Sequence, residues 1–354
     1  AGDAPILYDS TMLDQTTTDL KRMMTNKGYL NATVTPIVKL NKKKARITYD
    51  IKAGEPYRIS DYNIDISDSI ITNQKIQILP QKSRLNRNSS TYYSPVAEID
   101  SVLKINSLVQ KNSIFDLDKL DLERDRITSI FRRTGYYAFN KEFIGFEADT
   151  TLGNHKVGLD LTIYPFAERT QNGSILESPH REYVIKDVEF LVDYNPLIDG
   201  SINEYESTKV YEKNGYKIKY GPRGEYIKPH VILNSCYIVP GTLFSENMTT
   251  LTYSALSQLQ ILKNVNISFV PILKNDSTKL HCVITCVPDK RQGVSAEIEG
   301  TNSGGYFGVG AGVGYLHRNS FRGSELFNIK LKGAYEAISP SFSSFSENYF
   351  EIGG

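Results

Sequence analysis

Residues 294–337 read VSAEIEGTNSGGYFGVGAGVGYLHRNSFRGSELFNIKLKGAYEA, and two segments of this stretch alternate between large apolar residues and small or polar ones. The apolar residues of the first segment are separated by single glycines; they are Phe307, Val309, Ala311, Val313 and Tyr315. Those of the second segment alternate with polar residues as far as Gly333; they are Phe327, Ile329, Leu331 and Tyr335. Successive side chains of a β-strand point to opposite faces, so both segments are predicted strands with one apolar face.

The length of the two strands indicates what covers this apolar face. Segments of about ten residues match tilted strands that cross the apolar layer of an outer membrane. We therefore predict the opening hairpin of an antiparallel transmembrane β-barrel. Its lipid-facing residues would be Phe307, Val309, Val313, Tyr315, Phe327, Ile329, Leu331 and Tyr335. A strand of a soluble sheet shows the same alternation, and this alternative stays open.

The strand that precedes the hairpin, predicted for residues 294–302, has two faces of its own. Val294, Ala296, Ile298 and Gly300 lie on one face, whereas Glu297 and Glu299 share the other. A polar barrel interior explains the two carboxylates without acid–base chemistry. The glycine and polar residues at 301–305 weaken strand pairing, so this strand is expected to be loosely held.

A family resemblance adds to this interpretation. The segment GYLHRNSFRGSELF, residues 314–327, followed by GAYE at 333–336, resembles the first barrel hairpin of the BamA/TamA outer-membrane assembly family. Within that family it is most similar to TamL, the lipoprotein variant of Bacteroidetes. The resemblance covers nearly the whole chain. It implies tandem POTRA modules in the periplasm, a β-barrel in the bacterial outer membrane, and unfolded outer-membrane or surface proteins as clients.

The resemblance further implies how such a protein works and with whom. The first barrel strand would meet the last at a weak seam that opens sideways and templates a new strand. In this chain the seam residues would be Val294, Ala296, Ile298 and Gly300; an ordinary first hairpin strand is the alternative. A periplasmic partner anchored in the inner membrane, such as a TamB-like protein, is also implied. Whether the chain is closer to BamA or to TamA and TamL stays open.

Upstream of the hairpin, the pattern of a helix followed by two strands occurs three times. Gly28-Tyr29 and Gly135-Tyr136 each stand between a helical segment and an outgoing strand. Opening strands are predicted at residues 57–66 and 183–192. The order strand, helix, helix, strand, strand gives an α+β module, here called a POTRA module because of the resemblance. We expect modules at residues 1–54 (without its opening strand), 55–168 (insertion near 80–95) and 182–290 (insertion near 195–228), and barrel strands at 293–354.

Each module has residues assigned to its core and to its open edge. The return strands are expected to bury alternate residues; these are Val157, Leu159, Leu161 and Ile163, and Leu280, Cys282, Ile284 and Cys286. The third helix is expected to pack through Leu251, Ala255, Leu259 and Leu262. Residues 29–40, 137–146 and 264–272 are candidate edge strands for strand addition. The tyrosine-rich insertion at 195–228 is expected either to touch a partner or to pack on its own module.

Composition excludes several classes of protein. The 354 residues carry a formal charge of +1, which gives no reason to expect nucleic acid as a partner. The absence of an apolar run of about eighteen residues excludes a membrane-spanning helix. The sequence starts without a signal segment or a lipid-anchor cysteine and ends within a predicted strand, which leaves too few strands to close a barrel. We therefore expect a longer natural protein.

Catalytic and metal-binding patterns are absent from the sequence. The five histidines are scattered, and the glycines at 304–310 are not followed by the Lys-Ser/Thr of a phosphate-binding loop. We expect no enzyme activity, cofactor or metal. A disulfide from Cys236 to Cys282 or Cys286 would suit an oxidising periplasm, with buried free thiols as the alternative.

Together these observations predict an outer-membrane insertion or translocation factor. Its POTRA modules would engage partners or clients by strand addition, and its barrel seam would template membrane insertion. The alternatives are a two-partner secretion transporter, which has the same parts but a single dedicated substrate, and a soluble periplasmic binding or scaffold protein. Arg322-Gly323 is not taken as the Arg-Gly signature of the family, because that signature lies on a later barrel loop.

Overall fold

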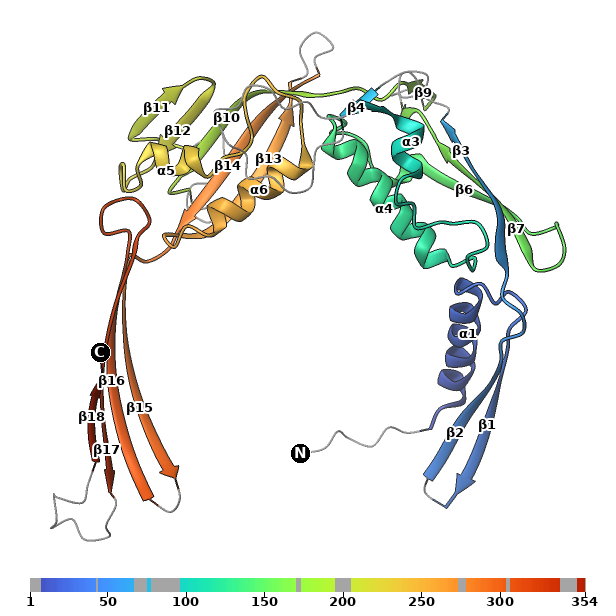
Figure 1. The fold of residues 1–354 in the computed structure, drawn as a ribbon, viewed down its shortest axis with the longest axis horizontal. Coiled ribbons are helices and arrows are strands. Elements are labelled where there is room, and N and C mark those ends of the chain that lie inside the picture. The colour runs from blue at the N-terminus through green and yellow to red at the C-terminus, as the bar shows by residue number, and fades with distance from the viewer. Residues whose placement is uncertain are drawn as a thin grey trace. The chain divides into compact units, whose positions relative to one another are not determined.

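The computed structural model describes residues 8–42, 44–66, 75–77, 96–169, 173–194, 205–272, 278–303, 306–337 and 349–353. The chain divides into two compact units, Ala1–Glu182 and Tyr183–Gly354. Both contain helices packed beside β-sheets (Figure 1). Among the described residues, no helix combines the length and the apolar character that a membrane span requires.

The first unit begins with helix α1 (Ser10–Asn26) and the hairpin of β1 (Thr33–Asn41) and β2 (Lys44–Lys52). Asp9 caps α1 by accepting a hydrogen bond from the Thr11 amide at 2.8 Å. Gly28 follows the helix with φ at 89°, which confirms the predicted left-handed C-terminal cap. The antiparallel register places Val34 opposite Ile51, so the apolar residues of both strands share one face. The segment predicted as a strand from residue 29 turns first and becomes β1 only at Thr33.

The rest of the first unit is built around a mixed sheet with the strand order β3-β7-β6. Strands β3 (Arg58–Ile66) and β7 (Lys156–Ile163) are parallel, and β6 (Ile144–Asp149) is antiparallel to β7. Helices α3 (Ile99–Lys104) and α4 (Leu117–Arg133) lie on one face of this sheet (Figure 1). Short pairs and a 3-10 turn complete the unit: β4 (Lys75–Gln77) with β5 (Val96–Glu98), β8 (Phe166–Arg169) with β9 (Ile175–Ser178), and η1 (Lys141–Phe143).

The core of this module confirms the predicted face of the return strand. Val157, Leu159, Leu161 and Ile163 are all buried. The cluster that fills the space between helices and sheet includes Leu103, Ile127, Phe131, Tyr136, Phe139 and Ile144. Of the predicted edge segment 137–146, only residues 144–146 are strand, because η1 occupies residues 141–143. The insertion predicted near 80–95 lies outside the described residues.

A tight junction joins α1 to the module that follows. The Tyr57 amide donates to the carbonyl of Gly28 at 2.8 Å, and the Phe115 amide donates to the carbonyl of Tyr57 at 2.9 Å. A Cβ at Gly28 would lie 2.5 Å from the Phe115 carbonyl oxygen, so only glycine fits this approach. Lys27 adds ion pairs to Asp116 and Asp118 at 3.2 and 2.7 Å.

The second unit contains a five-stranded sheet with the order β11-β12-β10-β14-β13. Its elements are β10 (Val184–Val192), β11 (Lys209–Lys213), β12 (Tyr216–Tyr220), α5 (Pro229–Asn234), α6 (Glu246–Ser257), β13 (Leu262–Pro271) and β14 (Lys279–Pro288). Strand β10 is parallel to β14, and β13 is antiparallel to it. This is the topology of β3, β7 and β6 in the first unit, with the hairpin β11–β12 added beside β10.

The packing of this module agrees with one helix prediction and corrects another. Leu280, Cys282, Ile284 and Cys286 are buried, as predicted for the return strand. The predicted face of the helix was wrong: α6 buries Thr252 and Leu256, while Leu251 is exposed and Leu262 already belongs to β13. Thr252 is tolerated in the core because its hydroxyl accepts from the Tyr237 amide at 2.9 Å and donates to the Met248 carbonyl at 2.8 Å.

The tyrosine-rich insertion packs on its own module, in line with the second of the two interpretations offered for it. Its residues 205–228 form β11, β12 and the loop that follows; residues 195–204 lie outside the described part. Tyr205, Tyr220 and Tyr226 are buried. The hydroxyl of Tyr205 donates to the Val192 carbonyl at 2.6 Å, and that of Tyr220 donates to the Ile227 carbonyl at 2.9 Å.

The three cysteines lie buried in this module as free thiols, so the proposed disulfide is not present. Cys282 and Cys286 belong to the buried face of β14, and the Cys236 thiol donates to the Ile238 carbonyl. Burial in apolar surroundings raises the pKa of the Cys286 thiol to about 12 and also raises that of Cys282, so both stay protonated at neutral pH.

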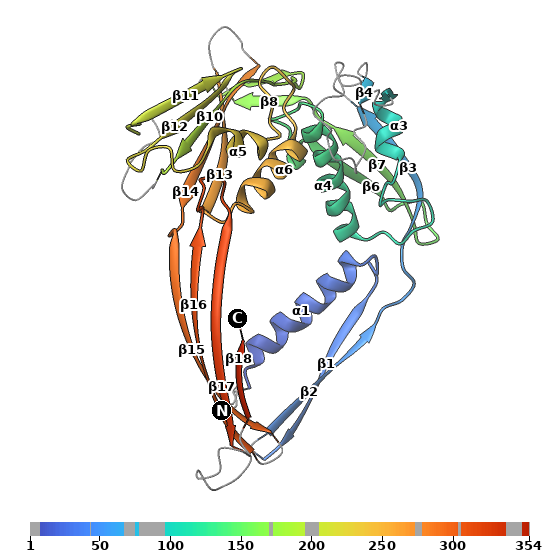
Figure 2. The same ribbon diagram turned by 60° about the vertical axis from the view of Figure 1, so that its left-hand side comes forward.

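The C-terminal part of the second unit is an antiparallel sheet with the order β15-β16-β17-β18. The strands are β15 (Gln292–Ser303), β16 (Tyr306–Arg318), β17 (Leu326–Ala337) and β18 (Tyr349–Gly353). Figure 2 shows the long strands side by side. The strands expected at residues 294–302, 307–315 and 327–335 therefore exist, and each extends beyond its predicted ends.

Candidate functional site: a two-faced sheet and open strand edges

The sheet of β15, β16 and β17 has one continuous apolar face. The register pairs Val294 with Tyr315, Val313 with Leu331, and Val309 with Tyr335. The side chains of this face are exposed rather than packed: Val294 is 79% exposed, Ile298 85%, Val309 60% and Leu331 58%. The side chain of Phe307 lies outside the described residues. This face leaves a band of apolar side chains without a protein partner among the described residues.

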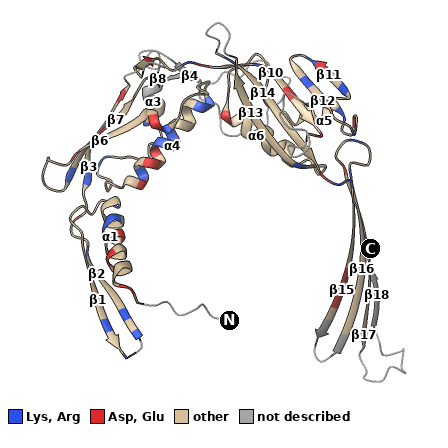
Figure 3. Cartoon of the chain, turned by 180° about the vertical axis from the view of Figure 1, so that it is seen from behind, with Lys and Arg blue, Asp and Glu red and all other residues tan. Residues whose placement is uncertain are grey.

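The opposite face carries charge and is organised by the glycines of β16. Glu297 on β15 forms ion pairs with Lys330 and Lys332 on β17, at 2.7 and 3.4 Å, and Lys332 also reaches Glu299 at 3.3 Å. These residues lie on strands that are not neighbours, because β16 runs between them. Figure 3 shows the acidic residues on β15.

The glycines explain how these charged side chains meet. A Cβ built on Gly312 would lie 3.2 Å from Cγ of Lys332 and 3.9 Å from Cβ of Glu297. A side chain at this position would therefore occupy the space through which Glu297 and Lys332 approach each other. The glycine pattern of β16 thus keeps the charged face low in its middle strand and lets β15 be held by β17 as well as by β16.

Strand β15 lies at the edge of its sheet. Among the described residues it pairs only with β16, and its other edge carries backbone N–H and C=O groups without a strand partner. Val294, Ala296, Ile298 and Gly300 are exposed along this strand. Of the segment 301–305, residues 301–303 belong to β15 and residues 304–305 lie outside the described part. An open edge of this length offers a template on which another strand can pair.

The modules present further open edges. In the described residues, β6 and β13 each pair on one side only, with β7 and β14 respectively, and the β1–β2 hairpin has no third strand. Strand β13 is the longest of these edges and contains residues 264–271 of the predicted segment. By contrast, β10 is covered on its outer side by β12 of the insertion. The edges left open are those that the sequence analysis assigned to strand addition.

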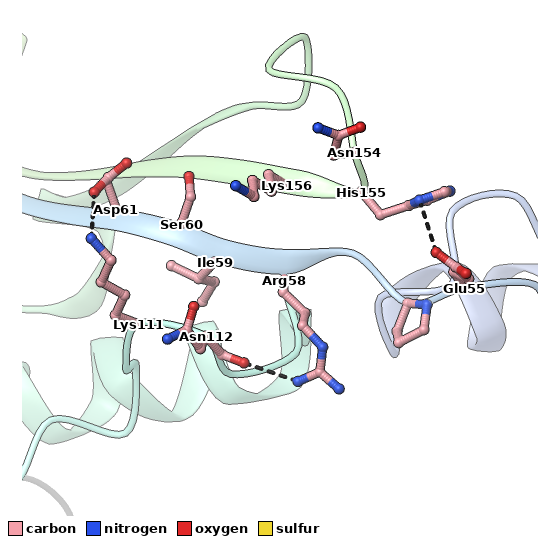
Figure 4. A pocket seen from close by; sticks show the side chains of 11 residues that line it. Glu55, Arg58, Ile59, Ser60, Asp61, Lys111, Asn112, Asn154, His155 and Lys156 are labelled. Atoms are coloured by element: carbon pink, nitrogen blue, oxygen red, sulfur yellow. Dashed lines mark hydrogen bonds and ion pairs between the residues drawn. The ribbon is translucent and has the colours of Figure 1, made fainter.

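A surface hollow in the first unit gathers polar side chains that pair with one another (Figure 4). Arg58 donates to the Asn112 carbonyl at 2.9 Å, and Lys111 forms an ion pair with Asp61 at 3.0 Å. His155 lies 3.3 Å from a carboxylate oxygen of Glu55. Since these groups neutralise each other on an open surface, their arrangement does not converge on a reactive centre.

A second charged group lies on the sheet of the second unit. His281 on β14 pairs with Asp187 and also lies 3.6 Å from Glu189, whose carboxylate binds Lys219 at 2.8 Å. The hydrogen bond with Glu189 raises the pKa of His281 against the effect of burial, and Asp187 raises it further. The described residues contain no group of three or more His, Cys, Asp or Glu side chains that could hold a metal ion. We therefore assign this cluster to the stability of the sheet.

Comparison with known proteins identifies one part of the chain directly. Residues 5–54, which include α1, β1 and β2, match the POTRA family model, described as a surface antigen variable number repeat. No curated protein sequence matches the chain.

Three solved structures give the range of structural likeness. BamA from Haemophilus ducreyi lacking POTRA domains 1-3 has 12% identity and a TM-score of 0.44, over 79% of this chain and 38% of that one. POTRA3-5 of BamA from Haemophilus influenzae has 12% identity and a TM-score of 0.40, over 80% and 83%. CdiB from Acinetobacter baumannii has 8% identity and a TM-score of 0.32, over 94% and 50%. This chain thus spans well under half of the first of these structures.

Two features of the site escaped the sequence analysis. Glu297 and Glu299 were assigned to a polar face, but their pairing with Lys330 and Lys332 across β16 was not foreseen. A Glu-x-Glu and a Lys-x-Lys on either side of a strand with glycine at every second position would have been the signal. The contacts of the turn between β16 and β17 were missed as well, because nothing in a single polar turn marks it as a docking element.

Proposed function

We propose that this protein is an outer-membrane insertion or translocation factor. Its POTRA modules lie in the periplasm, and β15–β18 are the first strands of a membrane β-barrel. The observation that carries the proposal is the presence, in one chain, of a POTRA match at residues 5–54 and a sheet whose apolar face is exposed. A large exposed apolar face on a protein marks an interaction surface, and lipid is the partner that suits a long, one-sided band.

The orientation of the sheet follows from its two faces. The residues proposed to face lipid are Val309, Val313, Tyr315, Phe327, Ile329, Leu331 and Tyr335, with Phe307 assigned from sequence alone. The face with Glu297, Glu299, Lys330 and Lys332 would then turn toward the polar barrel interior. This assignment keeps the charges in a wet environment and paired, which a hydrocarbon environment would strongly disfavour.

The proposed mechanism uses backbone pairing, so it requires neither a catalytic side chain nor a cofactor. Extended client or partner segments would add as strands to the open edges of β1, β6 and β13. The outer edge of β15, with the seam residues Val294, Ala296, Ile298 and Gly300, would template a client strand in the membrane. The ion pairs from β15 to β17 would keep β15 in register while its outer edge is exchanged.

The finer assignment rests on the resemblance of residues 314–327 and 333–336 to the first barrel hairpin of the BamA/TamA family. It supports membership of that family and, within it, the TamL lipoprotein variant with a TamB-like partner. Unfolded outer-membrane or surface proteins would be the clients.

Depletion of the protein in its native cell tests the proposal. We expect many β-barrel or surface proteins to decrease together in the outer-membrane fraction, as measured by quantitative mass spectrometry, and to recover when the wild-type gene is restored. Loss of a single secreted protein would instead indicate a dedicated two-partner transporter. Unchanged levels of all outer-membrane and surface proteins would contradict both.

A further inference from the structure

The turn between β16 and β17, residues 319–325, folds back on the module of the second unit. The Lys228 amide donates to the Arg322 carbonyl at 2.9 Å, and the Asn319 side-chain amide donates to the Tyr226 carbonyl at 2.6 Å. The Ile261 amide lies 3.3 Å from the Ser324 hydroxyl, to which it donates. The turn therefore contacts the module at two places that are far apart in sequence, the loop after β12 and the start of β13.

Asn319 is the central residue of this contact. It is only 4% exposed and adopts a left-handed backbone with φ at 78°, a conformation that asparagine tolerates better than most residues. Besides its bond to Tyr226, its side-chain oxygen accepts from the Ser324 amide at 2.9 Å, and its own amide donates to the Glu325 carbonyl at 2.6 Å. One side chain thus shapes the turn and binds the module at the same time.

The surface that receives the turn is held firmly by the tyrosine-rich insertion. Tyr226 is 2% exposed, and the hydroxyl of buried Tyr220 donates to the Ile227 carbonyl at 2.9 Å. The Arg223 amide is bound by the Asp193 carboxylate at 3.1 Å, which ties the loop to the end of β10. The loop at 225–228 is therefore a fixed part of the module.

The short linker between β14 and β15 supplies a second attachment at the same end of the sheet. The Arg318 amide donates to the Arg291 carbonyl at 2.7 Å, and the Arg318 guanidinium donates to the Lys290 carbonyl at 3.1 Å. The Asp289 amide donates to the Ile261 carbonyl at 2.7 Å. A single covalent linker would leave the sheet free to rotate, whereas two attachments define its orientation.

The junction in the first unit has a similar design. There the carbonyl of Gly28, in the loop after α1, accepts from Tyr57, and the Phe115 backbone packs against the same glycine. In the second unit the carbonyl of Ile261, in the loop after α6, accepts from Asp289, and Ser324 binds the same residue. The sheet thus docks on its module through the loop that one module uses to receive the next.

From these contacts we propose that residues 319–325 are a latch that sets the orientation of the β15–β18 sheet on the module, with Asn319 as its positioning residue. The insertion loop 225–228 is the receptor of this latch, which gives the tyrosine-rich insertion a role within the chain. The inference does not require that the sheet lies in a membrane.

Hydrogen exchange of the purified protein, read by mass spectrometry, tests the latch. In Asn319→Ala we expect about tenfold faster exchange in peptides that cover Lys228, Ile261 and the turn, since their hydrogen bonds open together. Peptides of β10 and β14 should keep their wild-type rates. Ser320→Ala is the matched control, because this exposed turn residue bonds only to His317 and should change none of these rates.

Asn319→Asp separates docking from folding of the turn. The carboxylate can still accept from Ser324 but cannot donate to Tyr226, so Lys228 should exchange faster while the turn keeps its protection. Faster exchange confined to the turn in Asn319→Ala would overturn the proposal. So would an unchanged rate at Lys228 in Asn319→Asp, which also decides the matter if Asn319→Ala loosens the whole module.

Discussion

Leu331→Lys is expected to prevent the protein from accumulating in folded form in the outer membrane. Leu331 lies near the middle of β17, opposite Val313, on the apolar face. A lysine near the bilayer midplane on the lipid side of a barrel costs about 2–4 kcal/mol, which is a large share of the stability of most folded proteins. Folding can be measured by the heat-dependent mobility of the barrel in gels and by protease resistance of the membrane fraction.

The control for this prediction is Asn328→Lys, on the same strand and the opposite face. Asn328 is exposed beside Lys330 and Lys332, where one more cation stays in a polar environment. Its effect should stay within about 0.5 kcal/mol, as for most surface substitutions. In a soluble sheet both variants would behave alike, because Leu331 is already 58% exposed. Equal accumulation of the two variants would therefore speak for a soluble sheet.

Proline at Val294, Ala296 and Ile298 is expected to abolish client assembly while the modules stay folded. Proline lacks the N–H that a strand donates and is tolerated poorly within a ladder. Because alternate residues of an antiparallel strand direct their N–H groups the same way, the three substitutions remove one row of donors from β15. Assembly is measured as the rate at which a β-barrel client becomes protease-resistant in cells that carry only the variant.

Alanine at Val294 and Ile298 provides the matched control. These variants trim the same side chains, which are 79% and 85% exposed, but keep every backbone donor. We expect them to retain most of the assembly rate. If the proline variants assembled clients normally, or the alanine variants failed as badly as the proline ones, the backbone edge of β15 would not be the template.

The sequence was informative where a periodic pattern met a solvent or core boundary. The alternation in β16 and β17 predicted both strands and the pairing of their apolar residues on one face, and the return strands β7 and β14 bury the residues assigned to them. Alternation is read reliably because each strand residue has only two directions to point.

The failures came from polar residues whose role depends on distant partners. Thr252 enters the core of α6 because Tyr237 satisfies its hydroxyl, and a periodicity of apolar residues cannot register this. Asn319 is buried by residues 93 positions away, and Glu297 is paired across an intervening strand. Such contacts are set by the tertiary arrangement, so they became visible only in the structure.

The central claim is that the apolar face of β15–β17 contacts lipid, and tryptophan fluorescence tests it most directly. The chain contains no tryptophan, so Ile329→Trp and Asn328→Trp each introduce a single reporter at adjacent positions on opposite faces of β17. In vesicles of brominated phospholipid, which quench tryptophan on contact, we expect strong quenching at position 329 and weak quenching at position 328. Equal quenching at the two positions, or none at 329, would contradict the account.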